Sequence, residues 1–330
     1  MAGGYCKLCH VLPPVDSSLF MQVNLIDLAQ EAVSELSTVN DFLRWGVSRF
    51  NASDVYLGHG TDNPWDECAS LITFVLNLGP QLNADLLTAK LTMTEKKDVV
   101  NLIIERIEKK VPAAYLTNIG YFCGLPFYVN EDVLVPRSPI GELITNRFSS
   151  LIESEPQRIM DLCTGSGCIA IACAYQFEEA TIDALDISPE ALTVADENIH
   201  RHGVQERVLP IISDVFSGVQ GQTYDLIVSN PPYVDAEDLG DMPAEFHHEP
   251  EIGLGSGEDG LDITRIILRE ASSHLNDNGV LIVEVGNSML QLQAEFPEVP
   301  FQWLEFENGG LGVFALTKQD LETHQALFDK

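Results

Sequence analysis

Hydrophobic residues follow different periods in different parts of the chain. Over residues 26–50 they recur every three or four positions, which is the spacing of a helix with one buried face. The same spacing returns at about residues 94–110, and a further helix is predicted to begin near Trp65. Residues 21–115 are therefore expected to form a helical domain, whereas residues 1–20 show no clear period and are expected to be a disordered leader.

The second half of the chain has a different pattern. Residues 116–137 are rich in strand-forming residues interrupted by Gly124 and Pro126, which predicts a short β-rich connection. Beyond it, hydrophobic strands alternate with helical segments. The predicted strands are 158–163, 181–187, 208–213, 224–229, 280–285, 301–307 and 312–317. The predicted helices are about 167–177, 189–202, 260–275 and 288–295.

This alternation predicts the fold class. Strand followed by helix implies right-handed crossovers and a mostly parallel sheet that is covered on both faces. Only residues 308–311 join the last two predicted strands, and so short a connection permits a hairpin but no parallel crossover. We therefore predict an α/β fold over residues 138–330, with a seven-stranded sheet whose last strand is antiparallel, beside a smaller N-terminal helical domain.

The charge balance narrows the classes of partner. The 330 residues include 18 Lys and Arg against 50 Asp and Glu, which gives a formal net charge of −32. Residues 138–330 hold most of the excess, with 34 acidic and 8 basic side chains. Such a surface repels DNA and anionic lipid and attracts basic proteins. The alternative is that the acidity only aids solubility.

The sequence also bears on location. No apolar stretch approaches the roughly 18 residues of a membrane span, and the N-terminus does not resemble a secretory signal. The seven cysteines have no disulfide-like spacing, which fits a reducing compartment. A cytoplasmic protein is expected.

The first strand of the sheet runs into a glycine-rich turn, DLCTGSGCIA, from Asp161 to Ala170. Gly165 and Gly167 allow the backbone to turn tightly and approach a ligand, and the following helix directs its amides toward that ligand. Asp186 ends the second strand 21 residues after Gly165, where a carboxylate can bind both hydroxyls of a ribose. The turn also fits the dinucleotide fingerprint, so it indicates an adenosine-bearing cofactor without distinguishing NAD from others.

A third acidic residue follows the third strand at the same edge of the sheet. Asp214 can accept a hydrogen bond from an adenine amino group, and Val215 and Phe216 can flank the ring. The alternative for an isolated aspartate in this position is a helix cap.

The fourth strand leads into Asn230-Pro231-Pro232-Tyr233. Two prolines fix the backbone and hold Asn230 extended. The asparagine oxygen beside a proline carbonyl gives a pair of acceptors for the two hydrogens of one NH2 group. Tyr233 offers a ring to pack on the planar group that carries this NH2.

These two motifs resemble the signature of S-adenosylmethionine-dependent amino-group methyltransferases, which act on nucleic-acid bases or on protein glutamine. Three further segments are similar to the bacterial N5-glutamine methyltransferases of large-subunit ribosomal protein three (L-three). They are GHGTDNPWDE at 58–67, VPRSPI at 135–140 with Glu142, and HEP at 248–250. The related enzymes that act on peptide chain release factors do not usually carry the first two.

The resemblance covers roughly residues 21–320 and implies a Rossmann-like methyltransferase domain, S-adenosylmethionine as cofactor and no metal. The helical domain is expected to recognise the substrate. The expected cofactor-binding residues are Asp161, Cys163, Thr164, Gly165, Gly167, Asp186, Ile187, Asp214, Val215, Phe216 and Asn230. The expected catalytic residues are Asn230, Pro231 and Tyr233, and the expected substrate-binding residues are these with Pro232, Arg137 and Glu142. A local ion pair is the alternative for Arg137 and Glu142.

Charge helps to choose among the possible substrates. Residues 234–264 contain ten acidic residues and no Lys or Arg. They directly follow the reaction motif, Asn230-Pro231-Pro232-Tyr233. This acidic segment is expected to lie at the rim of the site and to favour a basic protein such as L-three over DNA. The alternatives are release-factor glutamine methylation, DNA adenine-N6 methylation, an NAD-dependent oxidoreductase and a non-catalytic assembly factor.

The remaining motifs are interpreted as structural. The basic cluster on the helix at 94–110 is expected to be a solvated face; it comprises Lys96, Lys97, Arg106, Lys109 and Lys110. The haem-like or zinc-like pattern from Cys6 to His10 is interpreted as incidental, and His247-His248-Glu249 as part of a loop.

Overall fold

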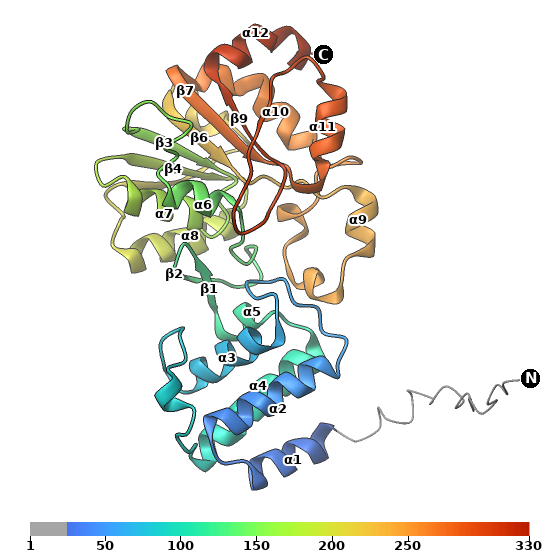
Figure 1. Cartoon of the computed structure of the whole chain (residues 1–330). Coiled ribbons are helices and arrows are strands. Elements are labelled where there is room, and N and C mark those ends of the chain that lie inside the picture. The colour runs from blue at the N-terminus through green and yellow to red at the C-terminus, as the bar shows by residue number, and fades with distance from the viewer. Residues whose placement is uncertain (1–24, 330) are drawn as a thin grey trace, which may run out of the picture.

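The computed structural model of the chain describes residues 25–329 (Figure 1). A helical part and a sheet-containing part lie end to end, with a small hairpin between them. The predicted leader over residues 1–20 and the motif from Cys6 to His10 lie outside the described residues.

Among residues 25–329 the helical part contains five α-helices, whereas the periodic pattern predicts three helical segments there. The five helices are α1 Leu25–Glu35, α2 Val39–Asn51, α3 Pro64–Val75, α4 Met93–Lys109 and α5 Ala113–Thr117. Their shared core includes the fully buried side chains of Phe42, Leu71, Ile72 and Ile103. The predicted start near Trp65 is confirmed, because Asn63 caps α3 and Pro64 is its first residue.

The helical stripe over residues 26–50 is divided between two helices. Thr38 caps α2 by accepting a hydrogen bond from the Asp41 amide, and the Asp41 carboxylate accepts one from the Thr38 amide. This capping box stabilises a helix start at a position where the hydrophobic period alone shows no interruption.

Arg106 corrects the prediction of a solvated basic face on α4. Its side chain is 1% exposed, and its guanidinium donates to Glu67 at 2.6 Å and to Glu245 at 3.2 Å. It also donates to the Tyr56 carbonyl at 2.8 Å. Because Glu245 belongs to the sheet-containing part, this buried ion pair lies where the two parts meet.

The β-rich connection is a two-stranded hairpin of β1 Ile119–Phe122 and β2 Leu125–Tyr128. Cys123 and Gly124 form its turn with φ of 49° and 76°, the positive values that a tight two-residue hairpin requires. Asn198 bonds to both polar groups of the Tyr128 backbone, at 2.7 and 2.9 Å. The hairpin is therefore fixed to the sheet-containing part.

Seven strands form the large sheet in the order β5-β4-β3-β6-β7-β9-β8. Their bounds are β3 Arg158–Leu162, β4 Thr181–Asp186, β5 Val208–Ile212, β6 Tyr224–Ser229, β7 Leu275–Glu284, β8 Gln302–Trp303 and β9 Val313–Thr317. Neighbours from β5 to β7 are parallel, and β9 is antiparallel to both β7 and β8. The predicted α/β fold and its antiparallel last strand are confirmed.

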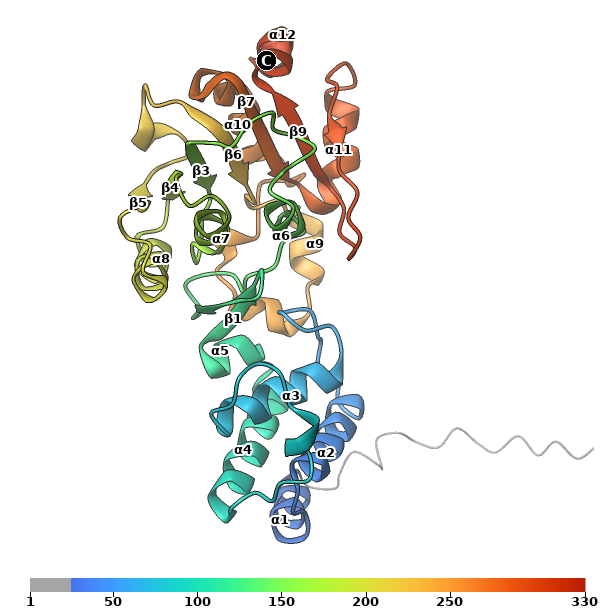
Figure 2. The same cartoon turned by 60° about the vertical axis from the view of Figure 1, so that its left-hand side comes forward.

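Helices cover both faces of this sheet (Figure 2). The helices of the sheet-containing part are α6 Ile140–Thr145, α7 Cys168–Gln176, α8 Pro189–His202, α9 Ala236–Asp241, α10 Asp262–Glu270, α11 Met289–Glu295 and α12 Lys318–Phe328, and α9 lies away from the sheet (Figure 1). Single 3₁₀ turns are Ala84–Leu86, Ser217–Val219, Ala244–His248, Glu251–Gly253, Ala271–His274 and Gly286–Ser288. Along β6, Leu226 and Val228 enter one core and Ile227 the other, because successive strand side chains point to opposite faces.

Strand β8 is shorter than predicted. Residues 304–312 form a loop, and the Glu142 carboxylate accepts hydrogen bonds from the amides of Glu307 and Asn308 in it. Among the helices of residues 25–329, none combines the length and apolar character needed to cross a bilayer.

Candidate active site

The glycine turn between β3 and α7 is attached to the end of the neighbouring strand β4. The Thr164 amide donates to the Leu185 carbonyl, and the Gly165 amide to the Asp186 carboxylate, both at 2.8 Å. Gly165 has φ of 53° and open space where a Cβ would lie. The backbone here can therefore be approached closely by a ligand.

Asp161 braces this turn from inside the protein. It is fully buried, and its carboxylate accepts from the Thr164 hydroxyl at 2.5 Å and from the Ala170 amide at 3.0 Å. Burial raises the pKa of Asp161 to about 7, and its second oxygen has no hydrogen-bond partner among the described residues. Asp161 thus supports the turn, and its predicted contact with the cofactor stays a prediction.

A cavity of about 220 Å³ lies beside the turn at the carboxyl edge of the sheet. Asp186 and Ile187 line it from the end of β4, and Asp214 and Val215 from the end of β5. The pKa of Asp186 is raised overall, because the effect of burial exceeds that of the hydrogen bonds from the Ser188 and Gly165 amides, which lower the pKa. The cavity thus joins apolar walls to two carboxylates, as an adenosine requires.

Four of the predicted cofactor residues do not line this cavity: Asp161, Thr164, Gly167 and Phe216. Asp161 supports the turn as described above, Thr164 lines a second cavity, and the other two are buried. Phe216 is fully buried and stacks on His274, with ring centroids 4.7 Å apart. Gly167 has φ of 79° and packs against Ala195, where an added Cβ would come within 3.3 Å. Phe216 and Gly167 therefore pack inside the protein at the edge of the sheet. The sequence pattern did not reveal this, because apolar neighbours or a glycine in a turn do not by themselves show which residues face a ligand.

Asn230 lies between this cavity and a second one. The second cavity measures about 360 Å³ and is lined by Pro231, Tyr233 and Arg137 among others. Asn230 lines both cavities. Its side-chain NH2 donates to the Arg137 carbonyl at 3.4 Å, which leaves the side-chain oxygen available as an acceptor.

Tyr233 is held through its ring and through its backbone. Its hydroxyl donates to Glu284 at 3.0 Å, and the other oxygen of Glu284 accepts from the Ser138 hydroxyl at 2.5 Å. Burial raises the pKa of Glu284 to about 7 and also raises the pKa of Tyr233. Glu284 ends β7 at the same edge of the sheet. Glu284 is not among the site residues predicted from the sequence, although a carboxylate at the carboxyl end of a parallel strand indicates a site residue.

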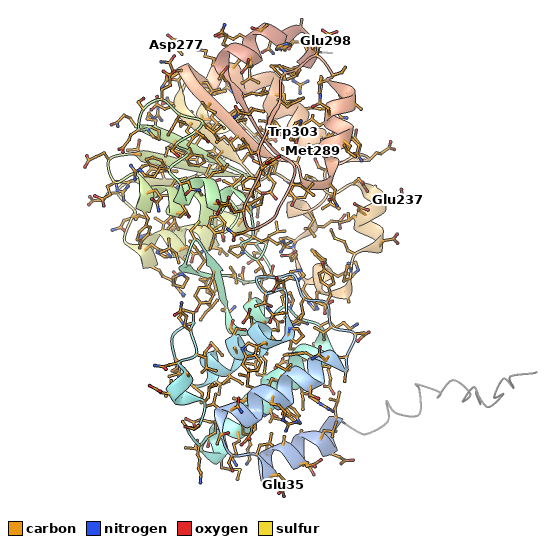
Figure 3. All side chains as sticks on the ribbon, viewed as in Figure 1. Glu35, Glu237, Asp277, Met289, Glu298 and Trp303 are labelled. Carbon is orange, nitrogen blue, oxygen red and sulfur yellow. The ribbon has the colours of Figure 1, made fainter. Side chains whose placement is uncertain are left out.

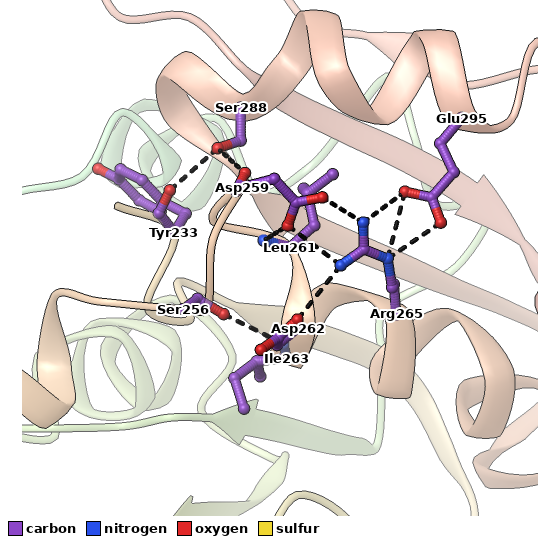
Figure 4. A network of polar contacts seen from close by, with 9 residues as sticks. All are labelled: Tyr233, Ser256, Asp259, Leu261, Asp262, Ile263, Arg265, Ser288 and Glu295. Carbon is purple, nitrogen blue, oxygen red and sulfur yellow. Dashed lines mark hydrogen bonds and ion pairs between the residues drawn. The ribbon is translucent and has the colours of Figure 1, made fainter. Parts of the chain in front are cut away.

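Figure 4 shows how the Tyr233 backbone is fixed. The Ser288 hydroxyl lies 3.0 Å from the carbonyls of both Tyr233 and Asp259. Arg265 in turn bonds Asp259 and Glu295, which anchors the loop that contains Asp259. Residues far apart in the sequence therefore hold the reaction motif in one position.

Substitution of Gly286 by alanine is expected to displace the Tyr233 ring and to lower the turnover number about 10- to 100-fold. A Cβ at Gly286 would lie 2.5 Å from an edge carbon of the Tyr233 ring, and φ is 46°. The matched control is Gly203→Ala, which has φ of 69° and nothing within 4 Å. The control should lose only about 1 kcal/mol of stability. Equal turnover in both variants would show that the ring position does not matter.

The predicted substrate residues Arg137 and Glu142 have different positions. Arg137 lines the second cavity and forms a two-point ion pair with Glu249, at 2.6 Å for each nitrogen. Glu142 lines neither cavity and instead holds Asn308 and Glu307 of the β8–β9 loop. The structure therefore brings Arg137 to the site and places Glu142 outside it.

The acidic segment over residues 234–264 is only partly free. Glu245 and Glu249 are buried in ion pairs, and Asp259 and Asp262 pair with Arg265. Within the described chain, the exposed acidic side chains of this segment without an ion pair are Glu237, Asp238, Asp241, Glu251 and Glu258. Figure 3 labels Glu237 on the outer side of α9.

The described residues contain no group of three His, Cys, Asp or Glu side chains arranged to hold a metal. In the segment His247-His248-Glu249, one ring nitrogen of His248 faces the Lys109 carbonyl at 3.1 Å, and Glu249 is committed to Arg137.

The strand order, the glycine turn after β3 and the motif after β6 define the chain as a Rossmann-like methyltransferase. The family model "Methyltransferase small domain" matches residues 143–246. The chain is 43% identical over 303 residues to the ribosomal protein uL3 glutamine methyltransferase of Francisella tularensis, covering 91% of this chain and 96% of that one. The protein of the same name from Neisseria gonorrhoeae is 49% identical over 293 residues, covering 88% and 98%. The chain belongs to the family of ribosomal protein uL3 glutamine methyltransferases.

Among solved structures, a methyltransferase of Pyrococcus furiosus is 19% identical, with a TM-score of 0.43. The match covers 59% of this chain and 89% of that one.

Proposed function

We propose that the protein transfers a methyl group from S-adenosylmethionine to the side-chain amide nitrogen of a glutamine in ribosomal protein uL3, the L-three protein. The observation that carries this proposal is the position of Asn230 at the boundary of two cavities, with its NH2 group bonded away and its oxygen left as an acceptor. Family membership supports the choice of glutamine and of uL3.

The smaller cavity fits the adenosine part of this cofactor. In this proposal Asp186 binds the ribose hydroxyls and Asp214 the adenine amino group, which their positions in the lining of the cavity support. Gly165 has no side chain to intrude on the ligand. The buried Asp161 oxygen without a partner adds an acceptor behind the turn. When bound, S-adenosylmethionine supplies an electrophilic methyl group.

The residues of the larger cavity act on the glutamine amide. An amide nitrogen is a poor nucleophile because its lone pair is delocalised into the carbonyl. As the nitrogen gains positive charge, its hydrogens become more acidic, and the Asn230 oxygen and the Pro231 carbonyl bind them more strongly than in the ground state. Tyr233 packs on the amide plane and limits its orientation.

Charge supports a basic protein as the substrate. Five exposed acidic residues of the segment 234–264 have no ion pair, namely Glu237, Asp238, Asp241, Glu251 and Glu258, and Asp238 lines the larger cavity itself. They would slow the approach of DNA and favour a basic partner. The five free cysteines of the described chain are consistent with a cytoplasmic location.

The test is incubation of the protein with S-adenosylmethionine and purified uL3, followed by mass spectrometry of the peptides. The expected product is one glutamine heavier by one CH2 unit. Peptide chain release factors and double-stranded DNA serve as competing substrates in parallel reactions. Methylation of a release factor in preference to uL3 would overturn the substrate assignment, and methylation of neither protein would overturn the proposed function.

Replacement of Asp186 by alanine is expected to raise the dissociation constant for S-adenosylmethionine about 10- to 100-fold, because a charged acceptor for the ribose is lost. Titration calorimetry measures this change, and NAD is titrated in parallel to test the oxidoreductase alternative. The control is Asp196→Ala, an exposed aspartate on α8 that lines neither cavity. An unchanged affinity in Asp186→Ala would contradict the ribose assignment, and tight binding of NAD would favour the oxidoreductase.

A further inference from the structure

Three segments that lie far apart in the sequence meet at the carboxylate of Glu249. The carboxylate is fully buried; it accepts two hydrogen bonds from the Arg137 guanidinium at 2.6 Å and one from the Val135 amide at 3.0 Å. On its other side, a ring nitrogen of His59 from the helical part lies 3.4 Å away. Phe246 packs on His59, with ring centroids 4.4 Å apart.

The surroundings of Glu249 favour its ionised form. Burial alone raises the pKa of Glu249, but its contact with His59 and its hydrogen bonds and ion pair with Arg137 lower the pKa to about 2. A buried, ionised carboxylate needs hydrogen-bond donors at both oxygens, because an oxygen without a donor would destabilise the folded state. The backbone at Val135 and the side chain of Arg137 are therefore held in fixed positions.

The segment that Glu249 holds bonds to Asn230 directly and is linked to Tyr233 through Glu284. The Arg137 carbonyl accepts the hydrogen bond that orients the Asn230 amide, at 3.4 Å. The next residue, Ser138, donates to Glu284, which accepts from the Tyr233 hydroxyl. An asparagine amide can be turned over to exchange its oxygen and nitrogen, and only an acceptor at a fixed position selects one orientation.

We propose that Glu249 is a positioning residue for the methyl transfer: by fixing Val135 and Arg137, it holds the Arg137 carbonyl that directs the Asn230 oxygen into the substrate cavity. This inference rests on the proposed function for the role of Asn230. It assigns to the His-Glu-Pro segment a task beyond the packing of two parts against each other.

The variant Glu249→Gln tests the inference, since it keeps the size of the side chain and removes the charge. The turnover number is expected to fall about 10-fold or more, because a substrate amide that Asn230 no longer orients reaches the reactive geometry less often. The dissociation constant for S-adenosylmethionine and the KM for uL3 should change by no more than about threefold. Wild-type turnover in this variant would overturn the inference.

Glu245→Gln is the matched control at the same junction. Glu245 is 1% exposed and binds Arg106 and the Tyr56 amide, but it has no hydrogen bond to residues 135–138 in the described chain. Both variants should lose thermal stability, and only Glu249→Gln should lose turnover. A parallel loss of turnover in both variants would show that Glu249 acts only in docking the two parts, which contradicts the inference.

A second measurement does not depend on methyl transfer. The side-chain amide of Asn230, assigned by its absence from the Asn230→Ala spectrum, should change its chemical shifts in Glu249→Gln and keep them in Glu245→Gln. Unchanged shifts in Glu249→Gln would overturn the positioning role. If the wild-type protein methylated no substrate, the proposed function would fail, while the shift of Asn230 would still report whether Glu249 orients it.

Discussion

Replacement of Asn230 by alanine should reduce methyl transfer by at least about 100-fold, the loss expected when one oriented polar group is removed from a transition state. Asn230 directly follows β6 and lines both cavities, and its oxygen is the acceptor left free by the bond from its NH2 group to the Arg137 carbonyl. The dissociation constant for S-adenosylmethionine should remain within about threefold of the wild-type value, since Asp186 and the glycine turn are untouched. Single-turnover kinetics and calorimetry measure the two quantities separately.

Asn230→Asp serves as the control, because it restores an acceptor oxygen of nearly the same size. A carboxylate would face the Arg137 carbonyl without a hydrogen to donate, so its orientation would be lost together with the neutral charge. This variant should therefore remain at least about 10-fold slower than the wild type. Full activity in either variant would remove Asn230 from the mechanism.

Arg106→Met is expected to lower the free energy of unfolding by about 3–5 kcal/mol, the usual cost of removing one partner from a buried ion pair. The methionine leaves Glu67 and Glu245 buried without their cation, and the Tyr56 carbonyl without a donor. Urea denaturation followed by circular dichroism measures the change in midpoint and slope.

The control for Arg106 is Lys97→Ala on the same helix, since Lys97 is exposed. Its effect on the free energy of unfolding should stay within about 0.5 kcal/mol. If Arg106→Met were equally mild, the network of Arg106, Glu67 and Glu245 would contribute little to the junction. In that case the two parts would be held mainly by apolar contacts.

Much of the fold could be predicted because the hydrophobic period reports which face of an element is buried. The seven strands were located to within a few residues, and the short connection before β9 predicted its antiparallel direction. The division at Thr38 was not visible in the same way, because a capping box depends on local hydrogen bonds. The burial of Arg106 could not be predicted from the helical pattern, because its partner Glu245 lies 139 residues away in the sequence.

The candidate site was predictable where function depends on the end of a strand. Asp186, Asp214 and Asn230 each lie at or just after the end of a parallel strand, and all three line the cavity at that edge of the sheet. Phe216 was expected at the site because it is close to Asp214 in the sequence, and Glu142 because of the resemblance to a family; both pack elsewhere. Contacts such as those of Glu249 depend on tertiary packing between segments more than 100 residues apart, which no local pattern encodes.

The hairpin of β1 and β2 has a consequence for how a large partner can bind. Because Asn198 fastens Tyr128 to the sheet-containing part and Phe122 and Phe127 are buried beneath the hairpin, the connection does not act as a loose tether. The distance between the helical surface and the reaction cavity is thereby set in the folded chain. A protein that contacts both must therefore present its two contact surfaces at one fixed separation.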